Sequence, residues 1–368
     1  MKSQHKIATF VPKGMRTGGP EAMHQLHYEL LEQGAESVLI ARPGTGRKNL
    51  VTEYSIYRPK WISIWQLKRS DVVIIPNDLG KVPFYYLLFV SRKKIFNWML
   101  AVDFAVDDNF RRYESKNYPL PKEWQKFLIK TNFLGRVINK ILSPYKIYIR
   151  DRKKTFRFKL KFDKANYLFQ SAYARETFRS IYKVNTGFMV TDYINVEDFR
   201  DTENYTMCKC IKRHVVYFPS KSQVLMELIL KVNARNHNQL HFISMKNLPK
   251  GHVVALLSKA DLYLDLGFFP GKDRMPREAI LLDCPVMLAR RGSARYHEDF
   301  PIPDKYLLDL AVETPDSVHE KLLETLIIPK SDHITLQAEF KNNVMRQKSL
   351  FREEVKGFLD YLRSQDFY

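Results

Sequence analysis

Three cations lie close together in segment 267–279, whose sequence is GFFPGKDRMPREA. Lys272, Arg274 and Arg277 each carry donor groups that bind phosphate oxygens well. Gly271 stands beside them, and a glycine lets the backbone approach a ligand closely. This combination is typical of a loop that holds a diphosphate, and we expect Gly271 and the three cations to bind one.

A glutamate and two glycines extend this candidate site. Glu278 is expected in the first turn of a helix that begins near Arg277, where its carboxylate either stabilises the helix N-terminus or accepts hydrogen bonds from ribose hydroxyls. Gly18 and Gly19 precede Pro20 between an expected strand and an expected helix, an arrangement that suits a phosphate or carboxylate. A structural turn explains the two glycines equally well. The spacing is neither a Rossmann fingerprint nor a P-loop, which disfavours dehydrogenases and NTPases.

The elements that position these residues alternate between short apolar strands and helical patterns, which is typical of parallel α/β domains. Hydrophobic residues recur at three- and four-residue intervals in the helical segments and form short continuous runs in the strands. We expect strands at 6–12, 37–41, 71–76, 94–101, 165–170, 214–218, 239–244, 261–266 and 285–289, and helices at 20–33, 222–234, 253–259, from 277, and at 332–363.

The length of 368 residues predicts about two domains, each large enough to bury a core. A polar stretch at 195–213 separates two α/β halves and reads as a linker. We therefore predict an N-terminal Rossmann-like domain at 1–194, a linker at 195–213, a second domain at 214–340, and a final helix at 341–368 that packs back onto the first domain. The longest apolar run, 82–90, has nine residues, fewer than the roughly 20 that a membrane-spanning helix needs.

These motifs resemble those of retaining glycosyltransferases of the GT-B fold, particularly the family 4 group, which use nucleotide-activated sugars. The glycine pair with Glu21 and His24 is similar to the loop before the first helix of that family. Residues 278–279 and 284–286 are similar to the end of its Glu-x7-Glu-Ala and Gly-x-Pro-Val pattern. Two positions depart from the pattern, because Pro270 stands where the earlier glutamate is expected and Cys284 where a glycine is expected.

The resemblance implies an α/β fold with two Rossmann-like domains facing a cleft, an N-terminal acceptor domain and a C-terminal nucleotide-sugar donor domain. In such enzymes a basic pair after the first C-terminal strands contacts the donor diphosphate; Lys221 resembles one member, and Lys272 or Arg274 replaces the other. A polar residue ending an N-terminal strand approaches the donor sugar. The implied catalytic residues are Asp103 and Glu278, and the implied donor-binding residues are Gly18, Gly19, Lys221, Gly271, Lys272, Arg274, Arg277 and Glu278. We expect no cofactor and no metal ion, since cations and a helix dipole can stabilise the leaving diphosphate.

The charge lies mostly in one half of the chain, because residues 1–200 hold 36 basic and 18 acidic side chains. Segment 122–164 alone carries 14 basic and 3 acidic residues among aromatic ones. Such a run suits the anionic face of a membrane, a nucleic acid, or simply a solvated surface. We favour the membrane and expect a cytoplasmic protein, peripheral at the inner face of the plasma membrane, that binds no nucleic acid. The membrane or acceptor residues are then Lys122, Lys126, Lys130, Arg152, Lys153 and Lys154.

The leading hypothesis is a glycosyltransferase that moves a sugar from a nucleotide-sugar donor to a saccharide or lipid-linked saccharide acceptor in surface polysaccharide assembly, such as capsule or lipopolysaccharide. The alternative is a non-catalytic binder of anionic polymer or nucleic acid on a degenerate GT-B scaffold, which the proline at position 270 and the basic aromatic segment 122–164 both favour. A sugar-nucleotide epimerase of the same fold is a third reading, but we can place no acid and base for it. Cys208 and Cys210 lack the second ligand pair of a zinc site, and His24 and His27 read as ordinary helix residues.

Overall fold

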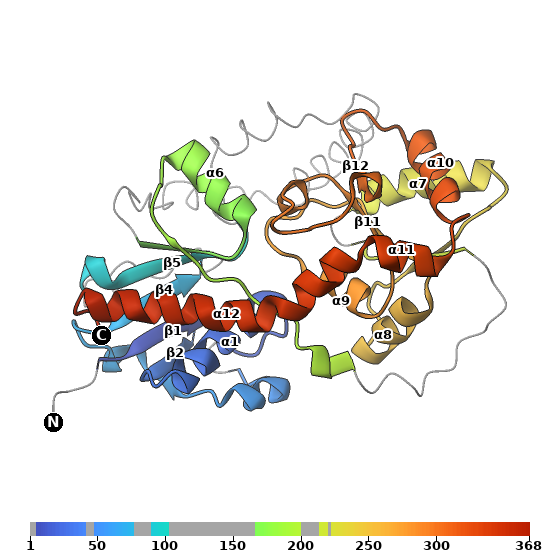
Figure 1. Ribbon diagram of the computed structural model, residues 1–368. Helices are drawn as coiled ribbons and strands as arrows, with labels where there is room; N and C mark the ends of the chain where they lie inside the picture. The colour runs from blue at the N-terminus through green and yellow to red at the C-terminus, as the bar shows by residue number, and fades with distance from the viewer. Residues whose placement is uncertain (1–4, 42–47, 77–89, 103–165, 200–212, 220–221) are drawn as a thin grey trace, which may run out of the picture.

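The computed structural model describes residues 5–41, 48–76, 90–102, 166–199, 213–219 and 222–368. These residues form two α/β lobes side by side, each built on a parallel sheet (Figure 1). The predicted fold class is confirmed. The basic segment 122–164 and most of the predicted linker 195–213 lie outside the described residues.

The sheet of the first lobe has seven strands in the order β3-β2-β1-β4-β5-β6-β7. Every neighbouring pair is parallel, and the first six strands follow the Rossmann order 3-2-1-4-5-6. The strands are apolar on both faces because helices cover a parallel sheet from both sides. They span β1 Ile7–Val11, β2 Ser37–Ala41, β3 Trp61–Ile62, β4 Val72–Pro76, β5 Ile95–Met99, β6 Asn166–Phe169 and β7 Phe188–Met189.

Among the described residues, the helices between these strands are α1 Gly18–Glu32 and α6 Ala172–Tyr182, and the 3-10 turns of this lobe are η1 Thr52–Tyr57, η2 Ile64–Gln66, η4 Arg92–Lys94 and η6 Val196–Phe199. Gly34 has a positive φ of 80° just after α1, the backbone conformation in which a helix commonly ends on glycine. At the other end, α1 begins two residues before the predicted start at Pro20. Both glycines therefore belong to the first helical turn.

The sheet of the second lobe has five parallel strands in the order β12-β11-β10-β8-β9. Numbered within the lobe, this is the flavodoxin-like order 2-1-3-4-5. The elements are β8 His214–Tyr217, α7 Gln223–Arg235, β9 His241–Ser244, α8 Lys250–Lys259, β10 Leu262–Asp265, α9 Arg274–Leu281, β11 Val286–Ala289, η8 Ser293–Arg295, η9 Asp304–Tyr306, β12 Leu307–Leu308, α10 Pro315–Thr325 and α11 Lys330–Leu336.

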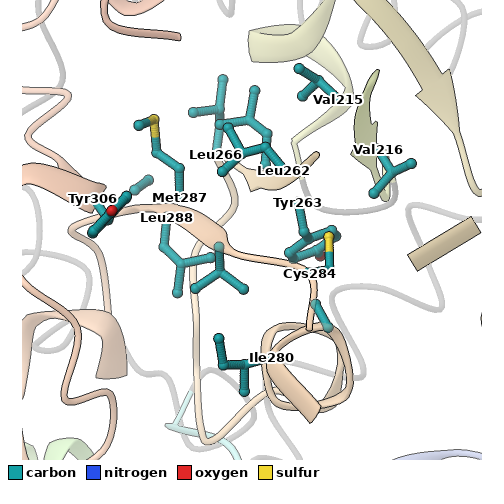
Figure 2. Close-up of a cluster of buried hydrophobic side chains, with 14 of the residues drawn as sticks. Val215, Val216, Leu262, Tyr263, Leu266, Ile280, Cys284, Met287, Leu288 and Tyr306 are labelled. Carbon is teal, nitrogen blue, oxygen red and sulfur yellow. The ribbon is translucent and has the colours of Figure 1, made fainter. Parts of the chain in front are cut away.

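The core of the second lobe lies between its sheet and the covering helices. Figure 2 shows Tyr263 of β10 beside Cys284, whose thiol is buried, with Ile280 of α9 at the edge of the cluster. Burial raises the pKa of the Cys284 thiol to about 12, so this cysteine packs as an apolar side chain. The cysteine at the position where the family pattern has a glycine thus has a packing role.

One helix joins the two lobes. The helix α12 Ala338–Ser364 runs along the first lobe and reaches the second beside α9 (Figure 1). Phe340 and Val344 pack in the core of the second lobe. Phe351 and Phe358, about two and four turns after Val344, pack in the core of the first. The final helix therefore belongs to both hydrophobic cores. In the described parts of the chain, no helix is long and apolar enough to cross a bilayer.

Candidate functional site

The glycine pair and the cationic loop lie at equivalent points of the two sheets. In open α/β sheets, ligands bind beyond the carboxyl ends of the strands where the strand order reverses. In the first lobe this point lies between β1 and β4, and α1 follows β1. In the second lobe it lies between β8 and β10, and the loop 266–273 follows β10. The two points face each other across the contact between the lobes.

The amino end of α1 is uncapped. The side chain of Thr17, at the N-cap position, makes no capping hydrogen bond. The first amides of a helix have no partner within the helix. Among the described residues, those of Gly18 and Gly19 have no other acceptor either. A Cβ built on Gly19 would have no atom within 4 Å, so the space on the side-chain side of this residue is open. Two amides and the positive end of the helix dipole are available to an anion here.

Arg274 of the second lobe lies against this helix end. A Cβ on Gly18 would stand 2.9 Å from Cδ of Arg274, so the guanidinium stem occupies the room that the glycine leaves. Its Nη1 donates to Oε2 of Glu21 at 2.6 Å, and its Nε donates to Oε1 of Glu278 at 3.1 Å. Burial alone lowers the pKa of Arg274, but Glu21 and Glu278 outweigh it and hold the pKa above its ordinary value. We call Glu21, Arg274 and Glu278 the rim triad.

Glu278 does not lie where the sequence suggested. The helix α9 begins at Arg274 with Asp273 at its N-cap, three residues earlier than predicted, and its first turn contains no acidic residue. Glu278 is consequently in the second turn and pairs with Arg274 four positions before it. The prediction that it stabilises the helix N-terminus from the first turn is wrong. Its carboxylate still borders the interlobe contact, where its side chain is 15% exposed.

The loop before α9 is attached to the first lobe through its backbone. The carbonyl oxygen of Pro270 accepts a hydrogen bond from the amide of Val102 at 2.7 Å. A Cβ on Gly271 would come within 2.2 Å of the carbonyl oxygen of Leu100 and 2.5 Å of Oε1 of Gln170. Ser293 Oγ donates to the carbonyl of Gly271 at 2.6 Å. Gly271 therefore lets the backbone approach the other lobe, whereas the sequence suggested a ligand at that position.

Arg277 is enclosed between the lobes, with no exposed side-chain surface. Its Nη2 donates to Oδ2 of Asp192 at 2.8 Å and to the carbonyl of Lys272 at 2.6 Å. Its Nη1 donates to the carbonyl of Asp192 at 3.3 Å and to Oε1 of Gln347 at 2.9 Å, and its Nε to the carbonyl of Asp273 at 3.2 Å. A guanidinium has five N–H groups, and all five are used. This arrangement leaves no donor for a diphosphate, so Arg277 holds the loop instead.

The carboxylate that pairs with Arg277 belongs to Asp192, a residue that the sequence did not indicate as its partner. It also accepts a hydrogen bond from Nε2 of Gln170 at 2.9 Å. Burial raises the pKa of Asp192, but the guanidinium of Arg277 more than offsets this and the net pKa lies below its ordinary value. We call Asp192 and Arg277 the buried pair. It joins the end of β7 in the first lobe to α9 in the second.

Lys272 is nearly buried, with 6% of its surface exposed, and has no ion pair among the described residues. Burial lowers its pKa, and the carboxylates of Asp299, Asp192 and Glu354 oppose this without cancelling it. Asp299 accepts hydrogen bonds from the first two amides of α6, each at 2.9 Å. Glu354 accepts from the amide of Thr191 at 2.7 Å. Each neighbouring carboxylate is therefore held by groups other than the ammonium.

Two predicted site residues, Asp103 and Lys221, lie outside the described residues, as do Lys122, Lys126, Lys130, Arg152, Lys153 and Lys154. Their neighbours in the chain are described. Val102, which precedes Asp103, is the residue that donates to Pro270. Pro219 follows β8 two positions before Lys221.

His24 and His27 are packing residues of α1, as the sequence suggested. Nδ1 of His24 donates to the carbonyl of Pro20 at 2.7 Å, and His27 lies between Ser37 Oγ and the carbonyl of Arg58. Burial lowers the pKa of each imidazole to about 4, so both rings are neutral at physiological pH. His27 holds α1 against β2 and the segment after η1.

No protein-family model and no curated protein matches this chain. Among solved structures, it is similar to a glycosyltransferase from Rickettsia africae, at 13% identity and a TM-score of 0.59 over 98% of each chain. It is also similar to Anabaena HepE in complex with UDP and glucose, at 9% identity and a TM-score of 0.60 over 98% of this chain and 100% of HepE. For TarM the identity is 9% and the TM-score 0.59, over 98% of this chain and 99% of TarM. The two parallel-sheet lobes joined in this way are those of the GT-B glycosyltransferase fold.

Proposed function

We propose that this protein is a glycosyltransferase that moves a sugar from a nucleotide-sugar donor to a saccharide or lipid-linked saccharide acceptor. The observation that carries the proposal is the meeting of Arg274, from one lobe, with the uncapped amino end of α1, from the other. Each lies at the ligand-binding edge of its own sheet. The GT-B fold and the UDP and glucose bound to Anabaena HepE support a nucleotide-sugar donor.

In this proposal the donor diphosphate lies between the two lobes. The amides of Gly18 and Gly19 and the guanidinium of Arg274 bind its oxygens, and Lys272 and Lys221 add positive charge. Glu278 accepts hydrogen bonds from the ribose. Negative charge develops on the diphosphate as the glycosidic bond to it breaks, and fixed cations and helix amides stabilise that charge without a metal ion. Arg277 acts indirectly, since it fixes the backbone that carries Lys272 and Asp273.

The sugar end of the donor is assigned to the carboxyl end of β5. We propose Asp103 as the catalytic polar residue there, because Val102 brings the chain directly to the Pro270 carbonyl. Pro270 supplies no carboxylate where the retaining family 4 pattern has one. In this proposal the backbone of the loop 268–271 contacts the sugar in place of that carboxylate. The family 4 assignment belongs to this proposal and is tested by the configuration of the product.

The acceptor side of the proposal rests on charge. Lys122, Lys126, Lys130, Arg152, Lys153 and Lys154 are assigned to a peripheral contact with an anionic membrane that presents a lipid-linked saccharide, as in capsule or lipopolysaccharide assembly. This places the protein at the cytoplasmic face of the plasma membrane. Replacing the six cations by glutamine is expected to reduce binding to vesicles of anionic lipid. Equal vesicle binding by the replaced protein removes the membrane assignment.

A thermal-shift panel of uridine, guanosine and cytidine diphosphate sugars tests the donor assignment. A ligand that binds only the folded state raises the melting temperature. We expect one base to raise it, and we expect Lys272→Ala and Glu278→Ala to reduce the shift. Arg235→Ala is the control, because it removes an exposed cation on α7 that pairs with the exposed Asp316 of α10, in the second lobe. No shift with any nucleotide sugar, together with tight salt-sensitive binding to oligonucleotides, would favour the anionic-polymer binder instead.

A further inference from the structure

The rim triad has more negative than positive charge. Arg274 faces two carboxylates, Glu21 at 2.6 Å and Glu278 at 3.1 Å, and the three side chains are 19%, 17% and 15% exposed. A diphosphate that approached this guanidinium would meet a site whose positive charge is already compensated. Like charges repel strongly in such a partly desolvated place. The triad therefore opposes the ligand that its arginine is suited to bind.

The two carboxylates differ in how they are held. Glu278 lies on the same helix as Arg274 and moves with it. Glu21 lies on α1 in the other lobe, where Tyr57 donates a hydrogen bond from its hydroxyl to Oε1 at 3.2 Å. The second oxygen of Glu21 is the one on Arg274. Glu21 thus reaches across the lobe contact, only one helical turn from the amides of Gly18 and Gly19.

An incoming diphosphate and the Glu21 carboxylate compete for the same donor. Both are anions, both suit the Nη1 group of Arg274, and both lie at the amino end of α1. When one binds, the other must leave or move. Exchange of Glu21 for a ligand also removes a contact between α1 and α9.

We propose that Glu21 is an affinity-determining residue, an internal anion that occupies Arg274 until the donor diphosphate replaces it. The inference rests on the proposed function, and it adds a competitor to the donor site. Glu21 lowers donor affinity and ties donor binding to a loosening of the contact between α1 and α9. A residue that simply bound the donor or held the fold would have the opposite effect on affinity when replaced.

The test compares Glu21→Gln with Glu278→Gln by calorimetric titration of the full chain with UDP, GDP and CDP. The two variants each remove one negative charge from the same guanidinium. For the base that binds wild type, we expect Glu21→Gln to bind about tenfold more tightly, an ordinary size for coupling between two ligands of one site. Glu278→Gln is expected to bind more weakly, because it loses a ribose contact. Unchanged or weaker binding by Glu21→Gln overturns the inference.

A ligand-free measurement separates this inference from the proposed function. Hydrogen exchange of the α9 amides is expected to be several-fold faster in Glu21→Gln than in wild type, since the interlobe ion pair is gone. If no nucleoside diphosphate or nucleotide sugar binds either protein, the proposed nucleotide-sugar donor is wrong. Faster exchange in Glu21→Gln would still show that Glu21 holds α9 across the lobe contact. If exchange is unchanged, Glu21 does not hold α9 and the inference fails.

Discussion

Two arginines stand three residues apart on one helix, yet their surroundings are opposite. Arg277 is fully enclosed, and its five N–H groups are matched by five acceptors from both lobes. Arg274 is 19% exposed and pairs with two carboxylates, of which Glu21 is the one that a ligand oxygen replaces in the proposal above. An arginine that is buried with all of its hydrogen bonds made fixes structure, whereas a partly exposed arginine can exchange one of its partners for a ligand.

The largest effect is expected where the buried pair is broken. Asp192→Asn leaves the Arg277 guanidinium enclosed without a compensating charge, and such a loss destabilises a protein by about 3–5 kcal/mol. Urea unfolding of the variant checks this. The control is Glu21→Gln in the rim triad. We expect it to lower the free energy of unfolding by about 1 kcal/mol or less, because the ion pair with Arg274 is partly solvated.

Similar losses of stability in the two variants would contradict the different roles of the two arginines. The double variant Asp192→Asn with Arg277→Met removes both charges and leaves none uncompensated. We expect the double variant to be more stable than Asp192→Asn alone.

As the pH falls, protonation of His24 on α1 should destabilise the fold before the buried pair loses its charge. The unfolded chain protonates His24 near pH 6.5, whereas the folded protein does so only near pH 4. The unfolded state therefore binds more protons between these values, and stability falls as the pH drops from 6.5 to 4. A shift of this size corresponds to at most about 3 kcal/mol for one histidine. Asp192, with its lowered pKa, stays ionised in the same range.

Melting temperatures between pH 7 and pH 4.5 check this prediction. The variant His24→Gln keeps a donor for the Pro20 carbonyl but cannot be protonated, so its melting temperature should fall less steeply. Parallel profiles for the variant and wild type would contradict the assignment.

Lys272 should show opposite effects on stability and on binding. Its lowered pKa means that the folded protein disfavours the charged ammonium, so Lys272→Met is expected to raise the free energy of unfolding at pH 7. The same variant should weaken binding of the nucleoside diphosphate. Chemical unfolding and calorimetric titration measure the two quantities. A variant that loses stability would instead place Lys272 among the residues that hold the lobes together.

The smallest effect concerns the two glycines. Gly18→Ala puts a methyl group 2.9 Å from Cδ of Arg274, while Gly19→Ala puts one where no atom lies within 4 Å. We expect Gly18→Ala to be about 1 kcal/mol less stable than Gly19→Ala, because overpacking forces Arg274 to move. Both positions are in the first turn of one helix, so helix propensity cancels. Equal stability in thermal unfolding would mean that Arg274 shifts at no cost.

Most of the architecture could be predicted from the sequence because parallel strands carry a local signal. The continuous apolar runs at β1, β2, β4 and β10 predict those strands to within one or two residues. The strands β3, β7 and β12 have two residues each, too few for any periodicity, and were not predicted.

The candidate site was harder to predict because its contacts join residues far apart in the chain. Arg277 and Asp192 are 85 positions apart, and Arg274 and Glu21 are 253 apart. Nothing near Arg277 distinguishes an enclosed arginine from a phosphate ligand. The start of α9 was misplaced because Pro276 suggested a first helical turn near Arg277, whereas proline is tolerated anywhere in the first turn.

The helix α12 has a consequence for synthesis of the chain. Glu354 binds Thr191 from 163 positions downstream, and Phe351, Val355 and Phe358 complete the core of the lobe whose strands are translated first. A nascent chain that has emerged only as far as α11 holds the first sheet with part of its apolar face uncovered. Such surface invites aggregation or chaperone binding. The first lobe to leave the ribosome is therefore among the last parts of the molecule to finish folding.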